Sequence, residues 1–96
     1  MIDVHILKEH IENLTTGKVE LRDQDGDTIA DIEKTSNSGL YIGFSTPGFS
    51  YVGLVLIDEA DMRVQGPTEL CIRSDSNGSR VILYAYSFAS MEVVNQ

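Results

Sequence analysis

Hydrophobic residues recur at helical spacing near the start of the chain. Most of them are separated by three or four positions, with Lys8, Glu9 and Glu12 on the opposite side, which is the pattern of an amphipathic helix. The hydrophobic positions are Ile2, Ile6, Leu7, Ile11 and Leu14. Asp3 is a suitable N-cap, and residues 15–17 (Thr-Thr-Gly) form a suitable stop. The sequence therefore predicts a helix from Asp3 to Leu14.

After this helix the pattern changes to short apolar or alternating runs that are typical of strands. The predicted strands cover Lys18–Arg22, Leu40–Ser45, Tyr51–Asp58, Glu69–Ser74 and Arg80–Ser87. Turn residues at 36–39, 46–48, 65–67 and 75–79 separate most of them, and Asn77-Gly78 is a hairpin signal. The run from Tyr51 to Asp58 is almost continuously apolar, so we expect a central strand with cover on both faces. Residues 89–96 carry no clear pattern.

Residues 23–35 permit two interpretations. Asp25-Gly26 could close a tight hairpin, with Thr28–Glu33 as the partner strand. In such a strand Ile29 and Ile32 would point to opposite faces. In a short helix they would share one face, with Asp27 as the cap. We favour a second short helix, and the hairpin stays open as the alternative.

These elements predict an α+β fold in a single domain over residues 1–96. It has an N-terminal helix and an antiparallel sheet of about five strands. In the favoured interpretation it also has a second short helix. No apolar run is long enough to span a membrane, and the first residues lack the features of a signal peptide. Cys71 is the single cysteine, which we expect to be buried, and a reducing cytoplasm suits such a chain.

The net charge of the chain says more about its possible partners than its overall composition does. Fifteen acidic residues oppose seven basic ones, giving a formal net charge of −8. The acids are densest between Glu20 and Glu33, and again between Asp58 and Asp61. A negative surface of this kind does not bind nucleic acid directly, since it cannot neutralise phosphates, but it can compete for proteins that do.

Candidate catalytic and metal-binding chemistry is weak. Asp23, Asp25 and Asp27 suggest a small metal- or ligand-binding module, but Gly26 is misplaced for a calcium loop of the EF-hand type. No nucleotide-binding glycine motif is present, and no histidine lies near Cys71 in the sequence. We expect a protein that is not an enzyme and holds no cofactor or metal.

The layout resembles that of the phage-encoded uracil-DNA glycosylase inhibitors, which are small acidic proteins that mimic the DNA backbone. Two short motifs carry the resemblance: residues 16–18 (Thr-Gly-Lys) after the first helix, and residues 75–78 (Asp-Ser-Asn-Gly) in the last hairpin. The likeness extends over nearly the whole chain. It implies a DNA-binding host protein, a glycosylase or a nuclease, as the partner. Related roles are the inhibition of CRISPR or restriction enzymes.

The resemblance also implies which residues bind that partner. The DNA-mimicking carboxylates correspond to Asp23, Asp27 and Asp31. The apolar pocket that takes the enzyme's intercalating side chain corresponds to residues of the second helix and the sheet, namely Ile29, Ile32, Ile42, Leu54, Leu56 and Ile72. The chain departs from the family where residues 23–25 read Asp-Gln-Asp and where Thr28 and Ala30 are neutral.

Overall fold

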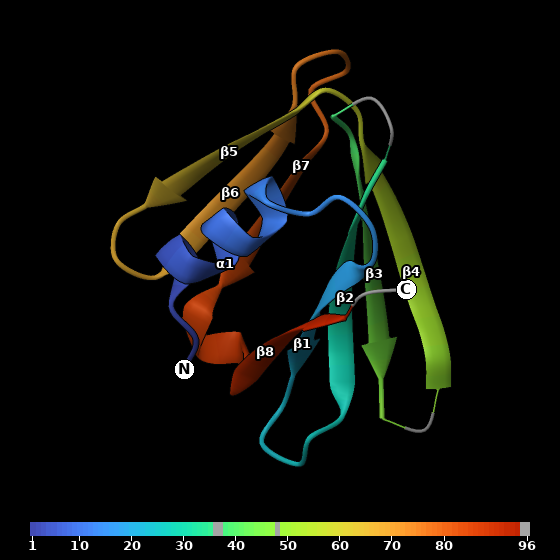
Figure 1. The fold of residues 1–96 in the computed structure, drawn as a ribbon, viewed down its shortest axis with the longest axis vertical. Helices are drawn as coiled ribbons and strands as arrows, with labels where there is room; N and C mark the ends of the chain where they lie inside the picture. Colours follow the sequence, from blue (N-terminus) through green and yellow to red (C-terminus); the bar gives the residue numbers. More distant parts are fainter. Residues whose placement is uncertain (36–37, 48, 95–96) are drawn as a thin grey trace.

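The computed structural model describes residues 1–35, 38–47 and 49–94, the side chains of residues 49–51 excepted. Residues 36–37 and 48, which belong to two of the predicted turns, therefore lie outside the described residues. In the described part of the chain one α-helix, α1 (Val4–Glu12), precedes eight strands (Figure 1). The strands are β1 (Lys18–Arg22), β2 (Thr28–Lys34), β3 (Leu40–Thr46), β4 (Phe49–Ile57), β5 (Ala60–Gln65), β6 (Glu69–Ser74), β7 (Arg80–Tyr84) and β8 (Ser90–Val94). A 3₁₀ turn, η1 (Ala85–Ser87), separates β7 from β8.

Helix α1 begins one residue after the predicted start at Asp3 and ends two residues before the predicted end at Leu14. Asp3 is the N-cap: its Oδ1 accepts hydrogen bonds from the backbone N–H groups of His5 at 2.8 Å and Ile6 at 3.3 Å. Its apolar stripe turns Val4, Leu7 and Ile11 into the core. The predicted N-terminal helix is confirmed.

Five strands form an antiparallel sheet, sheet A, in the order β4-β3-β2-β1-β8. Its inner face is set by alternation: Val19 and Leu21 of β1 are fully buried, while Lys18, Glu20 and Arg22 point to the other side. Strand β8, in the segment without a predicted element, pairs with β1. The predicted antiparallel sheet of about five strands is therefore present, but it does not account for the whole β-structure.

The prediction of a second short helix is wrong, because residues 28–34 form strand β2. The chain adopts the alternative that was left open, a β1–β2 hairpin. The physical reason is a β-bulge. Leu21 pairs with Ala30 but Arg22 pairs with Thr28, so Ile29 is an extra residue on β2. Ile32 is fully buried and Ile29 still packs against the core. The objection that a strand would send the two isoleucines to opposite faces fails at this bulge.

Three further strands form an antiparallel sheet B in the order β5-β6-β7. The chain passes from sheet A into sheet B at a corner between β4 and β5, where Glu59 has a positive φ of 49°. The buried hydroxyl of Ser74 donates a 2.6 Å hydrogen bond to the carbonyl of Asp58 and holds this corner. Eight strands in two sheets thus replace the single sheet of about five.

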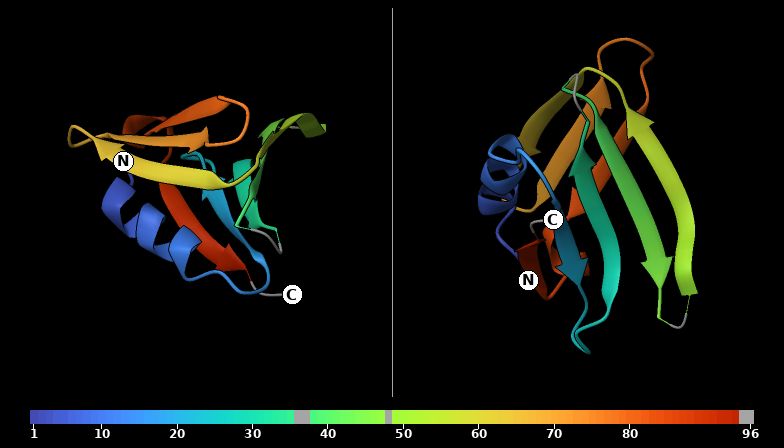
Figure 2. Two further views of the ribbon diagram at one scale, coloured as in Figure 1. Left: turned by 90° about the horizontal axis from the view of Figure 1, so that it is seen from above. Right: turned by 45° about the vertical axis from the view of Figure 1, so that its right-hand side comes forward.

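Helix α1 contacts β1 and β2 of sheet A and β5 and β6 of sheet B (Figure 2). One hydrophobic core lies between α1 and the two sheets, and it includes Leu7, Leu21, Ile42, Ile57 and Leu70. None of the helices formed by the described residues is long and apolar enough to cross a membrane.

Strand β4 does not occupy the central position that its apolar sequence predicts. It is the outermost strand of sheet A (Figure 2, right). On one side β3 pairs with it, and Val52, Leu54 and Leu56 are 61%, 53% and 45% exposed. A sequence typical of a strand covered on both faces therefore lies at an edge with one face open.

Candidate acidic and apolar surface of sheet A

The face of sheet A turned away from the core, here the outer face, combines carboxylates with apolar side chains. The cross-strand register sets the order of residues over it. One row runs Glu92, Glu20, Asp31, Gly43 and Leu54, from β8 to β4. The next row runs Val94, Lys18, Glu33, Tyr41 and Leu56. Each row is thus charged over β1 and β2 and apolar or neutral over β3 and β4.

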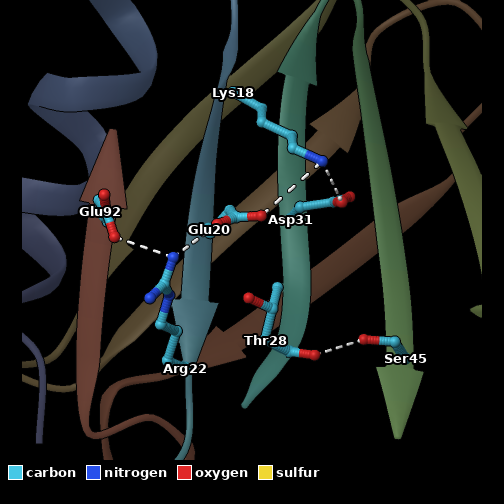
Figure 3. A network of polar contacts seen from close by, with 7 residues as sticks. All are labelled: Lys18, Glu20, Arg22, Thr28, Asp31, Ser45 and Glu92. Carbon is cyan, nitrogen blue, oxygen red and sulfur yellow. Dashed lines mark hydrogen bonds and ion pairs between the residues drawn. The ribbon is translucent and has the colours of Figure 1, made fainter. Parts of the chain in front are cut away.

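Two cations lie among the carboxylates on this face (Figure 3). Arg22 Nη2 lies between Glu20 Oε1 at 2.7 Å and Glu92 Oε2 at 2.8 Å. The hydrogen bond to Glu20, followed by the charge of Glu92, raises the pKa of Arg22 above its usual value. Arg22 therefore stays charged, and it offsets one of the two carboxylate charges over β1 and β8.

Over β2 the neutralisation is weaker. Lys18 Nζ lies 3.4 Å from Asp31 Oδ2 and 3.8 Å from Glu20 Oε2, so one ammonium is shared by two carboxylates (Figure 3). Glu33 is exposed and has no ion pair within the described residues. Ion pairs that remain partly open to solvent, as those of Lys18 are, contribute about 0–1 kcal/mol. A net negative charge therefore remains beside the apolar part of the face.

A shallow hollow of about 420 Å³ opens at this boundary, lined by Asp31, Glu33, Tyr41 and Leu54. Tyr41 is 41% exposed and pairs with Leu56 across the strands. The hollow can take an apolar side chain against Tyr41 and Leu54 while its carboxylates face a neighbouring cation. Exposed apolar surface rimmed by charge is a frequent mark of a protein-binding site.

The β1–β2 turn brings three more carboxylates together at one end of sheet A. Ligand atoms of Asp23, Asp25 and Asp27 all lie within 4.8 Å of one another. Asp23 Oδ1 already accepts hydrogen bonds from the N–H groups of Asp25 and Asp27, both at 3.0 Å. Gly26 supplies the positive φ of 85° that the turn requires. The cluster therefore has a structural role as an Asx-type turn.

The structure separates the predicted binding residues into three groups. Asp23 and Asp27 lie together in the turn, whereas Asp31 lies on the outer face with Leu54 and Leu56. Ile29 is half-buried against the core. Ile32, Ile42 and Ile72 have no exposed surface at all.

The predicted slot between a second helix and the sheet is therefore not formed. The second helix is a strand, and three of the six proposed slot residues are core residues that a partner reaches only if the protein unfolds. The exposed apolar side chains of Val52, Leu54 and Leu56 lie on the other side of the same sheet.

Sequence reasoning missed Glu33, Tyr41 and Val52. Glu33 alternates with Asp31 along β2, so both point outward, and Tyr41 pairs with Glu33 on the neighbouring strand. This signal was readable only in the hairpin interpretation, because a helix at 28–34 removes the pairing that places Tyr41 beside the carboxylates.

Comparisons of the chain with protein-family models, with curated proteins and with solved structures each found no match.

Proposed function

We propose that this protein is a non-enzymatic inhibitor that binds a DNA-processing enzyme in the cytoplasm by presenting a DNA-like negative surface. A uracil-DNA glycosylase is the first target, on the strength of the resemblance carried by residues 16–18 and 75–78. The partner is a DNA-binding protein, and the inhibitor itself contacts neither nucleic acid nor membrane.

One observation carries the proposal: an under-neutralised acidic tract lies directly beside exposed apolar side chains. Asp31 and Glu33 project from β2 at a spacing of about 6.6 Å. Leu54 and Tyr41 line the same hollow. A DNA-binding groove offers the complementary surface, which is basic and carries side chains that insert between bases.

The two parts of the surface contribute differently to binding. Excess carboxylates steer a basic partner and raise the association rate, because the interaction acts over a distance. Apolar side chains seated in a hollow slow dissociation, because they must be rehydrated on release. Together they give an inhibitor that is fast to bind and slow to leave.

A uracil-excision assay tests the proposal. Purified glycosylase is measured with and without a molar equivalent of this protein, and complex formation is followed by gel filtration. We expect excision to stop and a complex to elute. Undiminished excision together with separate elution would remove the glycosylase as the target.

Two matched variants test the surface itself. Glu33→Lys changes the charge on the outer face, and Glu9→Lys makes the same change on the exposed side of α1, which packs on the inner face of the sheet. We expect Glu33→Lys to lower the association rate about tenfold, while Glu9→Lys stays close to the parent protein. Equal effects of the two would mean that only net charge matters and that the outer face is not the binding surface.

The same surface suits the inhibition of a nuclease, including a CRISPR or restriction enzyme. Capture from a host lysate followed by mass spectrometry separates these targets. Glu33→Lys serves as the control bait, since a specific partner is lost from it and retained on Glu9→Lys.

A further inference from the structure

The β3–β4 hairpin is unusual for this chain because it contains no charge. From Leu40 to Ile57 no charged residue occurs, in a protein of which 23% of the residues are charged. The hairpin also supplies the free edge of sheet A, through β4. Its outer face is apolar, with Tyr41 on β3 and Val52, Leu54 and Leu56 on β4.

A free edge strand with this composition is suited to pair with a strand of another chain. The backbone N–H and C=O groups of every second residue point away from β3, where no described strand meets them. Proteins usually protect such an edge by a charged side chain, a proline or a short strand. Strand β4 has nine residues and contains neither a charged residue nor a proline.

We propose that β4 is a self-association edge, on which the β4 strand of a second copy pairs antiparallel about a two-fold axis at Leu54. The two copies of sheet A then form one continuous ten-stranded sheet. An axis perpendicular to the sheet keeps both outer faces on the same side, so outward residues meet outward residues.

In this register the outward side chains of β4 face apolar side chains of the second copy's β4. Leu54 lies opposite the second copy's Leu54, and Val52 lies opposite the second copy's Leu56. Apolar side chains that face each other at about 4.5–5.5 Å stabilise an antiparallel pair. Gly53 meets the second copy's Val55 on the inner face, where glycine leaves room for the larger residue.

The absence of charge on β4 favours a second copy over a charged peptide. A basic segment on the β4 edge would lie three strands from Asp31, or about 14 Å, and its cations would be desolvated against Leu54 and Leu56 without a partner. The uncharged edge of a second copy avoids this cost. The carboxylates of the two copies stay on the far strands.

The dimer has two expected properties. Two paired edge strands bury a small interface of the size found in transient complexes, so dimerisation is weak and depends on concentration. Each copy carries a charge of −8, so added salt strengthens the dimer by screening repulsion. Binding of a basic partner, as proposed above, is weakened by salt. The two associations are therefore distinguishable by the sign of their salt dependence.

Sedimentation equilibrium from micromolar to millimolar protein, at about 0.01 M and about 1 M NaCl, tests the proposal; over this range the Debye length falls from about 30 Å to about 3 Å. We expect a monomer–dimer equilibrium whose dissociation constant falls with salt. Leu54→Glu should raise that constant about tenfold or more, because two carboxylates then face each other. Val52→Glu is a second disrupting variant, and circular dichroism checks that both are folded.

Ile6→Glu is the matched control. Ile6 is 45% exposed on α1, so the same apolar-to-acidic change adds the same charge away from the edge, and the dimer should persist. A chain that stays monomeric at millimolar concentration and high salt overturns the proposal. A dimer that tolerates Leu54→Glu and Val52→Glu overturns it as well.

Crosslinking tests the register. Leu54→Cys places two thiols opposite each other within the range of a disulfide, so oxidation should trap a covalent dimer. Leu56→Cys is the control, because its two thiols are about 13 Å apart along the strands. The native Cys71 is buried in the parent protein, so we expect it to take no part in the crosslinking. Equal trapping by the two variants, or trapping by Leu56→Cys alone, contradicts a two-fold axis at Leu54.

Discussion

At the scale of single residues, hydrophobicity predicts burial but not the side of a sheet on which a residue lies. Ile32 and Leu54 are both apolar strand residues that the resemblance assigned to one pocket. In the structure Ile32 is 0% exposed and Leu54 is 53% exposed. The difference comes from pairing, because Ile32 faces α1 and sheet B while Leu54 faces away from both. Cys71, which the sequence predicts as a buried residue, is buried.

This difference predicts unequal effects of truncation on stability. Ile32→Ala leaves a cavity in the core and should lower the free energy of unfolding by about 2–5 kcal/mol. Leu54→Ala removes an exposed side chain and should change it by less than about 0.5 kcal/mol. Urea unfolding at low protein concentration measures both. A large loss for Leu54→Ala would place this residue inside the core.

At the scale of elements, periodicity identified the long helix and most strands, and it failed where the decisive interaction was between segments. The short helix predicted after Asp27 depended on Ile29 and Ile32 sharing one face, with Asp27 as the cap. Strand β2 is determined instead by the turn that Asp23 closes, by the small buried residue Ala30, and by a bulge that turns Ile29 toward the core. None of these is a hydrophobic repeat.

The missed strands β5 and β8 have a similar explanation. Strand β5 follows directly on β4 after a corner at Asp58 and Glu59, without the glycine or proline that usually marks a break. Strand β8 acquires its register from β1, at the other end of the sequence. For the same reason the candidate surface was predictable only in part: Asp31, Leu54 and Leu56 were identified, but their shared face follows from the pairing of β2, β3 and β4.

The β1–β2 hairpin depends on Gly26. Its φ of 85° is a conformation that residues with a Cβ rarely adopt, and the strain of adopting it is about 1–2 kcal/mol. Gly26→Ala should therefore lower the free energy of unfolding by about 1 kcal/mol. Gly53→Ala is the control, because this glycine has no positive φ and an added Cβ there meets no atom within 4 Å. Equal losses in urea unfolding would mean that the turn conformation does not limit stability.

At the scale of the whole molecule, the charge of −8 opposes the compact state. The ion pairs of Lys18 and Arg22 are only half-buried, and pairs in contact with solvent contribute little to stability. The loss caused by screening them is therefore smaller than the gain from screening the excess repulsion. Raising NaCl from about 0.01 M to about 1 M should therefore increase the free energy of unfolding, by about 1 kcal/mol. Thermal unfolding at low protein concentration measures the effect, and a fall in melting temperature with salt would contradict it.

The contrast between the two edges of sheet A limits how far a sheet can grow. Pairing through two β4 strands is isologous and closes, leaving β8 at both ends of the ten-stranded unit. There Glu92, held by Arg22, places charge beside the open backbone and disfavours addition of a further chain. Near the isoelectric point of about 4.4 the mutual repulsion of chains vanishes. Head-to-tail contacts between β4 and β8 then become competitive, and the sheet can extend into filaments. Acidic storage is therefore the condition under which this protein should gel or fibrillise, while neutral pH keeps growth at two copies.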